Sequence, residues 1–148
     1  MIRVFTIFCL LIYATPIFGS VNVTNYGAVG DLQTLVNINV VSNSTALVCP
    51  GASFSAVDIG KLIEVVGGGI FQTVSNDTLY AYITAVSSPT NITVSVAAGA
   101  TITNLIGLYG TDCQPAFSNA IAACASPTDT LIIPAGNYFC VPRDFLLG

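Results

Sequence analysis

The sequence predicts a mainly β fold with one helix, and three observations support this. Hydrophobic residues make up 53% of the 148 residues and charged residues only 7%, and Ser, Thr, Asn and Gly supply most of the polarity. β-favouring runs separated by turn residues recur between residues 37 and 97. Helical spacing of apolar residues is convincing only in residues 112–125. This combination is typical of a β-rich secreted domain rather than of a disordered or coiled-coil chain.

Residues 1–19 have the order of a secretory signal peptide. Arg3 provides a basic start, an apolar run follows from Phe5 to Ala14, and Gly19 ends the segment with a small residue. Cleavage is expected after Gly19. The alternative is an uncleaved membrane anchor, but about fifteen apolar residues interrupted by Pro16 are short for a membrane span. We therefore expect a secreted protein that meets a membrane only during export.

The middle of the chain contains a series of predicted strands. They are the runs 37–41, 45–49, 62–66, 78–86 and 91–97. Alternating apolar residues place one face of the run 78–86 against a core: Leu79, Ala81, Ile83 and Ala85. The turn residues 87–90 predict a hairpin between the last two runs.

Two shorter signals lie between these strands. One helical turn is expected at residues 55–59, just before Gly60. The run Gly67-Gly68-Gly69 is expected to form a flexible turn. It is not interpreted as a phosphate-binding loop, because no Gly-Lys-Ser/Thr ending and no helix follow it.

Residues 112–125 are predicted to form the helix. Asp112 is the preferred N-cap, because it puts Pro115 at the third helical position, where the missing N–H has no partner to lose. Thr111 is the alternative, in a capping box with Gln114, but it moves Pro115 one position deeper. The predicted apolar stripe is Phe117, Ala120, Ile121 and Cys124. A strand at 131–133, a turn at 134–136 and a second strand at 137–141 are expected to follow.

Two separated stretches share a recognisable pattern. They are Asn25-Tyr26-Gly27-Ala28-Val29-Gly30-Asp31, and Gly110-Thr111-Asp112 followed by Ala116-Phe117, Ala120-Ile121 and Ile133-Pro134-Ala135-Gly136-Asn137-Tyr138. Together they resemble the opening of the pectate lyase superfamily, closest to the rhamnogalacturonase/epimerase-like β-helix proteins and the family 28 polygalacturonases. Residues 54–63 resemble a segment carried by inserts in such proteins. One departure is Cys113, which stands where the family pattern usually has a second Asp.

The resemblance implies a fold and a division of the chain. The implied fold is the opening part of a right-handed parallel β-helix with one N-terminal capping helix and a β-rich insert. The implied divisions are the signal peptide 1–19, the first half of the split motif 20–31, the insert 32–110, and the capping helix with the first β-helix strands 111–148. The motif residues are expected to be structural: Gly30, Asp31, Asp112, Pro134, Gly136 and Tyr138. Because no polar capping segment precedes Gly148, we expect an N-terminal fragment.

Secretion would leave four cysteines in an oxidising compartment: Cys49, Cys113, Cys124 and Cys140. Their even number predicts structural disulfides, with free buried thiols as the alternative. Cys113 and Cys124 cannot bond across the predicted helix, since about 16 Å separates them and disulfide Cα atoms lie within about 7 Å. We favour Cys124 with Cys140, which leaves Cys49 with Cys113, although the spacing leaves the pairing open. Zinc is not expected, because the chain has no His and no close Cys-x-x-Cys pair.

Four N-x-S/T sequons follow the leader, at Asn22, Asn43, Asn76 and Asn91. In a eukaryotic host they predict glycosylated surface segments. In a chain so rich in Ser, Thr and Asn some sequons arise by chance, and the motif has no meaning in a bacterium.

The inventory of charged residues limits the chemistry. Only Lys61 and Arg143 are basic after the leader, so binding to nucleic acid is not expected. A polysaccharide hydrolase needs two positioned carboxyl groups, and a pectate-type lyase needs a base, usually with calcium. No residue of this chain is expected to be catalytic, to bind a cofactor or to bind a metal. Calcium is expected only in the parent protein, if that protein is a lyase.

The resemblance implies a parent that is a secreted, carbohydrate-active enzyme. It would act on uronate-containing, pectin-like polysaccharide by hydrolysis or β-elimination, outside the cell or in the cell wall. This chain would be its structural, inactive N-terminal part. The alternative is a non-catalytic secreted β module that binds glycans or a cell surface, because acid and base groups are scarce here. The oligomeric state does not follow from the sequence.

Overall fold

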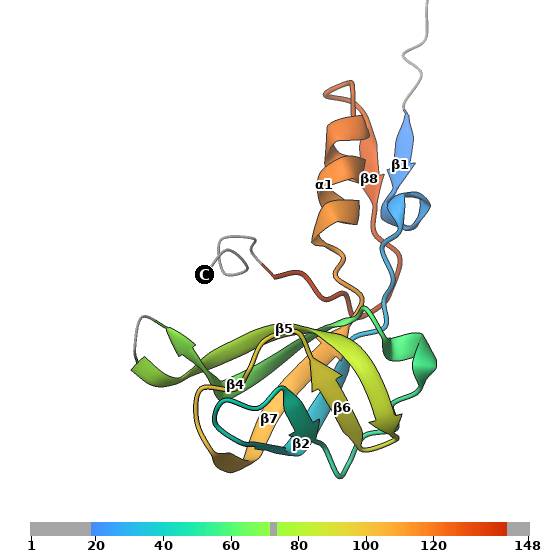
Figure 1. The fold of residues 1–148 in the computed structure, drawn as a ribbon. Coiled ribbons are helices and arrows are strands. Elements are labelled where there is room, and N and C mark those ends of the chain that lie inside the picture. The colour runs from blue at the N-terminus through green and yellow to red at the C-terminus, as the bar shows by residue number, and fades with distance from the viewer. Residues whose placement is uncertain (1–18, 72–73, 142–148) are drawn as a thin grey trace, which may run out of the picture.

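The computed structural model describes residues 19–71 and 74–141, with the side chains of residues 70–76 left out (Figure 1). A β-barrel forms the wide lower part, and a helix with two short strands forms the narrow upper part. The predicted signal peptide, except for Gly19, lies outside the described residues, as does the end of the chain after Val141. Among the described residues, no helix combines the length and the apolar character needed to cross a membrane.

Six strands form the barrel: β2 (Gln33–Val40), β3 (Ala46–Val48), β4 (Leu62–Phe71), β5 (Val74–Ser88), β6 (Asn91–Val94) and β7 (Ile102–Gly110). They close in the order β2-β3-β6-β5-β4-β7, and every neighbouring pair is antiparallel. The short helix η2 (Ala56–Asp58) precedes β4, where one helical turn is predicted. Closure pairs the edges of the sheet, so the barrel offers no long open edge to another chain.

Alternating apolar residues fill the barrel interior. They include Leu35, Ile38, Val40, Leu47, Ile63, Val65, Leu79, Ala81, Ile83, Ile92 and Val94. Phe54 and Tyr109 join this core with their rings edge to face and their centroids 4.9 Å apart. Complete burial of each large aliphatic side chain contributes about 1.5–3 kcal/mol, so this core is the main source of barrel stability.

The predicted inner face of β5 is correct up to Ile83. Leu79, Ala81 and Ile83 are buried, but Ala85 is exposed. The pairing of β5 with β6 shifts register between Ile83 and Ala85, and Val86 packs against the core instead. A register shift of one residue reverses the face that each side chain occupies. The predicted hairpin between β5 and β6 is confirmed.

The expected flexible turn at Gly67-Gly68-Gly69 is wrong, because all three residues lie inside β4. Gly67 has φ +82°, a conformation that other residues rarely adopt. A Cβ atom on Gly69 would lie 2.5 Å from the carbonyl oxygen of Thr78 in the paired strand. These glycines therefore allow a tightly packed irregularity in a long strand, where the pairing with β5 also shifts register.

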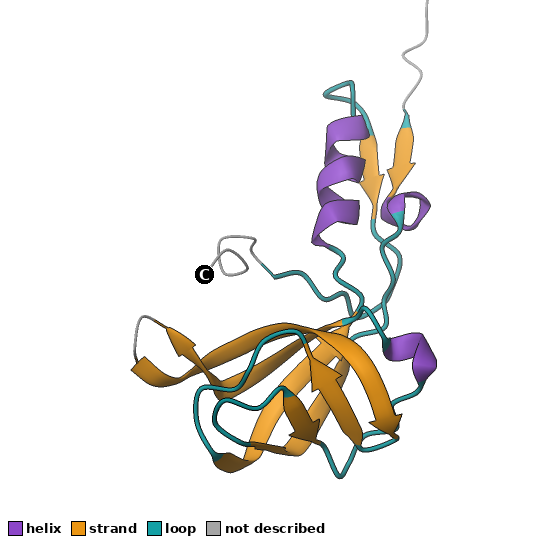
Figure 2. Cartoon of the chain, viewed as in Figure 1, coloured by secondary structure: helices purple, strands orange, loops and turns teal. Residues whose placement is uncertain are grey.

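The upper part contains β1 (Ser20–Asn22), η1 (Val23–Tyr26), α1 (Gln114–Ala123) and β8 (Thr130–Ile132). β1 and β8 pair in parallel, and α1 lies beside them (Figure 2). A second core holds this part together and consists of Val23, Ala28, Cys113, Ala116 and Ala120, with Val21, Phe117, Leu131 and Tyr138 packed at its edge.

The predicted helix is correct in kind but shorter than expected. α1 spans ten residues, and Cys113 rather than Asp112 occupies the N-cap position. Asp112 still assists the first turn, because the N–H of Gln114 donates to its carboxylate at 3.0 Å. Pro115 lies at the second helical position rather than the predicted third, still within the first turn. Ile121 is 58% exposed and does not belong to the buried stripe.

The predicted right-handed parallel β-helix is wrong. Parallel pairing in the described residues consists of β1 with β8 and two isolated bridges, Asp31–Asn137 and Asp112–Phe139. The strand predicted at 137–141 is therefore replaced by these two bridges. Most strands belong instead to the closed antiparallel barrel. Short turns such as 89–90 join antiparallel neighbours directly, whereas parallel neighbours need a crossover of a dozen or more residues.

Candidate functional site

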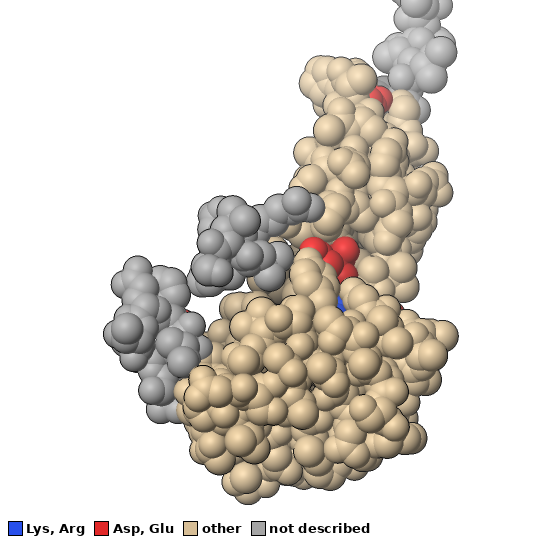
Figure 3. Space-filling view, viewed as in Figure 1, with Lys and Arg blue, Asp and Glu red and all other residues tan. Residues whose placement is uncertain are grey.

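Charged atoms gather where the upper part meets the barrel (Figure 3). The Lys61 ammonium lies 2.9 Å from a carboxylate oxygen of Asp31 and 3.0 Å from one of Asp58. Its nitrogen also lies 5.8 Å from the centre of the Tyr109 ring, within range of a cation–π interaction. We call Lys61, Asp31 and Asp58 the triad. Asp31 precedes the barrel and Lys61 precedes β4, so the triad joins two segments thirty residues apart in sequence.

Each carboxylate of the triad has further hydrogen bonds. Thr111 donates to Asp31 from its N–H at 2.8 Å and from its hydroxyl at 2.9 Å. Ser55 donates to Asp58 from its N–H at 2.8 Å and from its hydroxyl at 3.3 Å. Asp58 thereby caps η2, and Asp31 ties the chain entering the barrel to the chain leaving it.

The pKa values of the triad follow from these contacts. Partial burial would raise the pKa of Asp31, but hydrogen bonds from Lys61 and Thr111 outweigh it and lower the pKa. For Asp58, burial is likewise outweighed by bonds from Ser55 and Lys61, and its pKa is also lowered. Burial would lower the pKa of Lys61, but the two carboxylates raise it. All three groups are therefore charged at neutral pH.

This arrangement is suited to structure rather than to acid–base chemistry. A general acid needs a raised carboxyl pKa, whereas both carboxylates here have lowered values. Across the described residues, no three His, Cys, Asp or Glu side chains are grouped so that they could hold a metal ion. The sequence analysis missed the triad, although Lys61 follows Asp58, the last residue of η2, by three positions, and this spacing was a usable signal.

The split motif is brought together at the same junction. A Cβ atom on Gly30 would lie 2.9 Å from the Cα of Gly136, so these two backbones are in close contact. The Tyr138 hydroxyl donates to the carbonyl of Pro134 at 3.0 Å, and its ring packs edge to face on Phe117 with centroids 5.5 Å apart. All six barrel strands lie within residues 32–110, the range predicted to be an insert. That this range is an insert in the motif stays a prediction.

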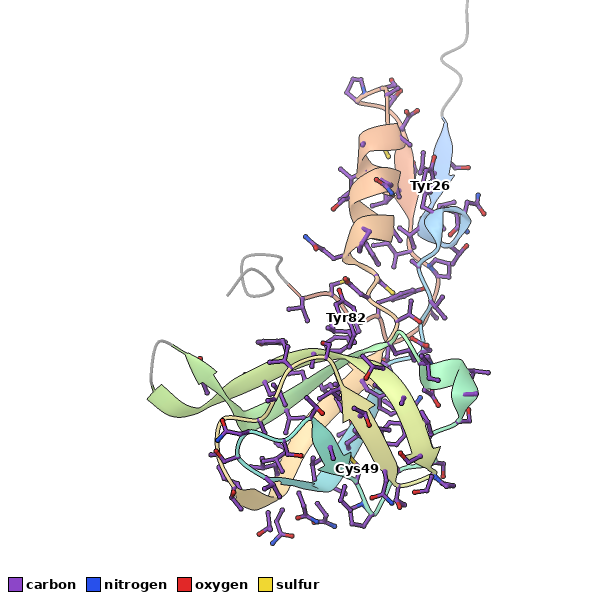
Figure 4. All side chains as sticks on the ribbon, in the orientation of Figure 1. Tyr26, Cys49 and Tyr82 are labelled. Carbon is purple, nitrogen blue, oxygen red and sulfur yellow. The ribbon has the colours of Figure 1, made fainter. Side chains whose placement is uncertain are left out.

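The four cysteines described are free thiols in different surroundings. Cys49 lies in the barrel core (Figure 4), and burial raises its pKa to about 12. Cys113 belongs to the upper core, so the pairing of Cys49 with Cys113 does not fit this structure. Cys124 follows the C-terminal end of α1. Cys140 lies next to Phe139, whose carbonyl accepts a hydrogen bond from the N–H of Cys113 at the N-terminal end of α1. The favoured pairing of Cys124 with Cys140 does not fit either.

The sequon asparagines differ in their exposure. Asn43 is exposed in the turn between β2 and β3, and its amide nitrogen donates to the Ser42 hydroxyl at 3.3 Å. Asn22 accepts hydrogen bonds from Thr24 through its side-chain oxygen, and the Asn91 amide nitrogen donates to Ser88 at 2.7 Å. The side chain of Asn76 lies outside the described residues. Asn43 is the most exposed of the three sequon asparagines whose side chains are described, and this exposure favours it as a glycosylation site.

A shallow hollow of about 190 Å³ lies on the outer face of β2, β7 and β4. Its lining consists of Thr34, Glu64, Val66, Ile106, Gly107 and Leu108. Ile106 is 58% exposed and Val66 48% exposed, so the apolar wall faces open solvent. The Tyr80 hydroxyl approaches the Glu64 carboxylate at 3.4 Å from the next strand. The wall of the hollow is thus almost wholly apolar, and Glu64 and Thr34 are its two polar lining residues.

A scan against protein-family models finds no match to this chain, and a search of curated proteins finds no similar sequence.

Proposed function

We propose that the chain is a secreted, non-catalytic β module that binds a neutral sugar unit of a polysaccharide in the hollow between β2, β7 and β4. The observation that carries the proposal is the make-up of this hollow. Val66, Ile106 and Leu108 offer an apolar surface to the C–H face of a sugar ring, and Glu64 and Thr34 offer hydrogen-bonding partners for its hydroxyls.

The size and charge of the hollow limit the kind of sugar that it could bind. Its volume of about 190 Å³ is below the roughly 300 Å³ of drug-sized pockets, so it suits one ring rather than an oligosaccharide. The Glu64 carboxylate would repel a uronate carboxylate at close range. A neutral hexose or pentose unit therefore fits better than a uronate.

The positions of the acids argue against catalysis at this surface. Glu64 is the single acid lining the hollow, whereas glycoside hydrolysis requires two facing carboxyl groups. Asp31 and Asp58 are held by Lys61, and Asp129 accepts hydrogen bonds from the N–H groups of Gly19 and Ser126. These carboxylates stabilise turns and junctions.

The test is binding of the full chain to a panel of soluble neutral polysaccharides, measured by calorimetry. Replacing Ile106 by Asp should abolish binding, because it puts a charge on the apolar wall. Val57→Asp is the matched control, since Val57 is 79% exposed on η2 and does not line the hollow. Equal binding by the two variants, or no binding of any neutral glycan by the wild type, would contradict the proposal.

A second candidate is the structural part of a secreted enzyme that degrades pectin-like, uronate-containing polysaccharide. The observation that favours it is the meeting of the motif residues Gly30 and Gly136, and of Asp31 and Thr111. Its test is release of reducing ends or unsaturated uronates from polygalacturonate by the protein purified from its native source. Dependence of elimination on calcium would identify a lyase. Depolymerisation without binding of neutral glycans would favour this candidate over the first.

A further inference from the structure

Cys113 and Cys140 lie side by side where the C-terminal segment passes the start of α1. Asp112 and Phe139 form a parallel bridge, and the N–H of Cys113 donates to the carbonyl of Phe139 at 2.8 Å. Cys113 and Cys140 are the residues that follow this isolated bridge in the two segments, and Cys113 is near enough to raise the pKa of Cys140. Bridged segments lie about 4.8 Å apart and disulfides join Cα atoms about 4.4–6.8 Å apart, so we expect this pair to be within reach of a disulfide.

The other described cysteines are poor partners for this pair. Cys124 is separated from Cys113 by the ten residues of α1, which correspond to about 15 Å. Cys49 is completely buried in the barrel core. The backbone ladder therefore selects one pairing that the sequence spacing leaves open.

The two cysteines differ in their exposure to solvent. Cys113 is completely buried, and its Sγ accepts a hydrogen bond from the N–H of Val29 at 3.3 Å. The same thiol lies 3.2 Å from the carbonyl of Val29 and 3.3 Å from that of Thr111, which fixes its position. Cys140 is exposed at the surface. One partner is thus held in place and the other is open to reagents.

We infer that Cys113 and Cys140 form a disulfide when the protein meets an external disulfide such as oxidised glutathione. The Cys140 thiolate attacks one sulfur of the reagent, the reagent's S–S bond breaks, and one thiolate leaves. The Cys113 thiolate then attacks the Cys140 sulfur of the mixed disulfide and releases the second thiolate. Two protein thiols are oxidised, one reagent disulfide is reduced to two thiols, and the protons lost by the protein pass to the leaving thiolates.

The bond would fasten the C-terminal segment to the helix. The segment already packs on the barrel, because Phe139 and Val141 form a buried cluster with Leu62. The closed loop would contain α1 and β8, and closing a loop of this length should raise the Tm by roughly 10 °C. Partial burial raises the pKa of Cys140, and Cys113 and Asp112 raise it further, so oxidation should speed up as pH increases above neutral.

The test is oxidation of the full chain in a glutathione buffer, followed by alkylation of free thiols and peptide mapping without reductant. The expected product is one cross-linked peptide pair containing Cys113 and Cys140, with a mass loss of about 2 Da for two hydrogens. Cys124→Ser is the matched control and should give the same cross-link and the same rise in Tm. Cys140→Ser should give neither, and it changes a position that is exposed at the surface.

A second variant checks the order of the steps. Cys113→Ser should accumulate a glutathione adduct on Cys140, because the resolving thiol is absent. A cross-link between Cys124 and Cys140, or a wild-type chain that keeps both thiols free after oxidation, would overturn the inference.

Discussion

Replacing Lys61 by methionine should destabilise the protein by roughly 2 kcal/mol. The side chain of Lys61 is 20% exposed, and those of Asp31 and Asp58 are 23% and 8% exposed. Exposed ion pairs contribute about 0–1 kcal/mol, whereas removing one partner of a fully buried pair costs about 3–5 kcal/mol. The triad lies between these limits. Methionine keeps the packing of the aliphatic stem, so the loss reports the two ion pairs.

The assay is urea unfolding of the wild type and Lys61→Met at pH 7. With a slope of about 1–3 kcal/mol per molar urea, the midpoint should fall by roughly 1 M while the slope stays unchanged. Lys61→Met combined with Asp58→Asn should recover part of the loss, because the more buried of the two carboxylates is then replaced by a neutral amide. A loss below about 0.5 kcal/mol, or a double variant no more stable than Lys61→Met alone, would refute this reasoning.

The stability difference between the wild type and Lys61→Met should depend on pH. The pKa values of Asp31 and Asp58 are lowered from 3.8, so their contribution is complete above that value and is lost as pH falls through the folded-state pKa. The pKa of Lys61 is raised from 10.5, so its contribution is complete below that value and is lost as pH rises through the folded-state pKa. The stability difference between wild type and variant should therefore be greatest between about pH 5 and 10. A difference that stays constant down to about pH 2 would contradict the lowered carboxyl pKa values.

Three further predictions concern the barrel. Gly69→Ala should lower the free energy of unfolding in urea by about 2–3 kcal/mol, because its Cβ would meet a backbone carbonyl of β5 at 2.5 Å. Gly51→Ala is the control and should change this free energy by less than about 0.5 kcal/mol, because its Cβ would have its nearest contact at 3.7 Å. Phe54→Ala should cost about 3–5 kcal/mol through the cavity and the lost ring contact, and a thermal shift of less than a few degrees would argue against its place in the core. Cys49 should resist iodoacetamide in the native protein at about pH 8 and react after unfolding in urea, since it is buried and its pKa is raised to about 12; labelling at the same rate in both states would contradict its burial.

Local patterns in the sequence located several elements and missed the strands β1 and β7. The runs within β4, β5 and β6 and the turn at 55–59 have strong alternation or clear turn residues, and these elements are confirmed. β7 was missed because Asn104, Gly107 and Gly110 interrupt its pattern of β-favouring residues. Asn104 adopts a positive φ of 61°, and Gly107 lies against the backbone of Glu64 too closely for a side chain. These residues lower β propensity where the barrel needs close strand contact.

The topology and the charged triad could not be read from local patterns. Barrel closure depends on the pairing of β2 with β7, which lie at opposite ends of the range 33–110, and strand patterns do not identify a partner. Asp58 and Lys61 are three residues apart and were within reach of sequence reasoning. The contact of Lys61 with Asp31 exists only once the fold places β4 beside the entry to the barrel.

The junction between the two parts is held by three different kinds of interaction. The chain enters the barrel at Leu32 and leaves it at Gly110, where a Cβ would lie 3.1 Å from the Leu32 Cα, so the two crossing points are in contact. Hydrogen bonds and an ion pair meet at Asp31, and Leu62 packs on Phe139 beside them. Ion pairs weaken at extreme pH, whereas apolar burial does not depend on protonation. The barrel and the upper part should therefore stay attached when the triad is neutralised, because the packing of Leu62 on Phe139 remains.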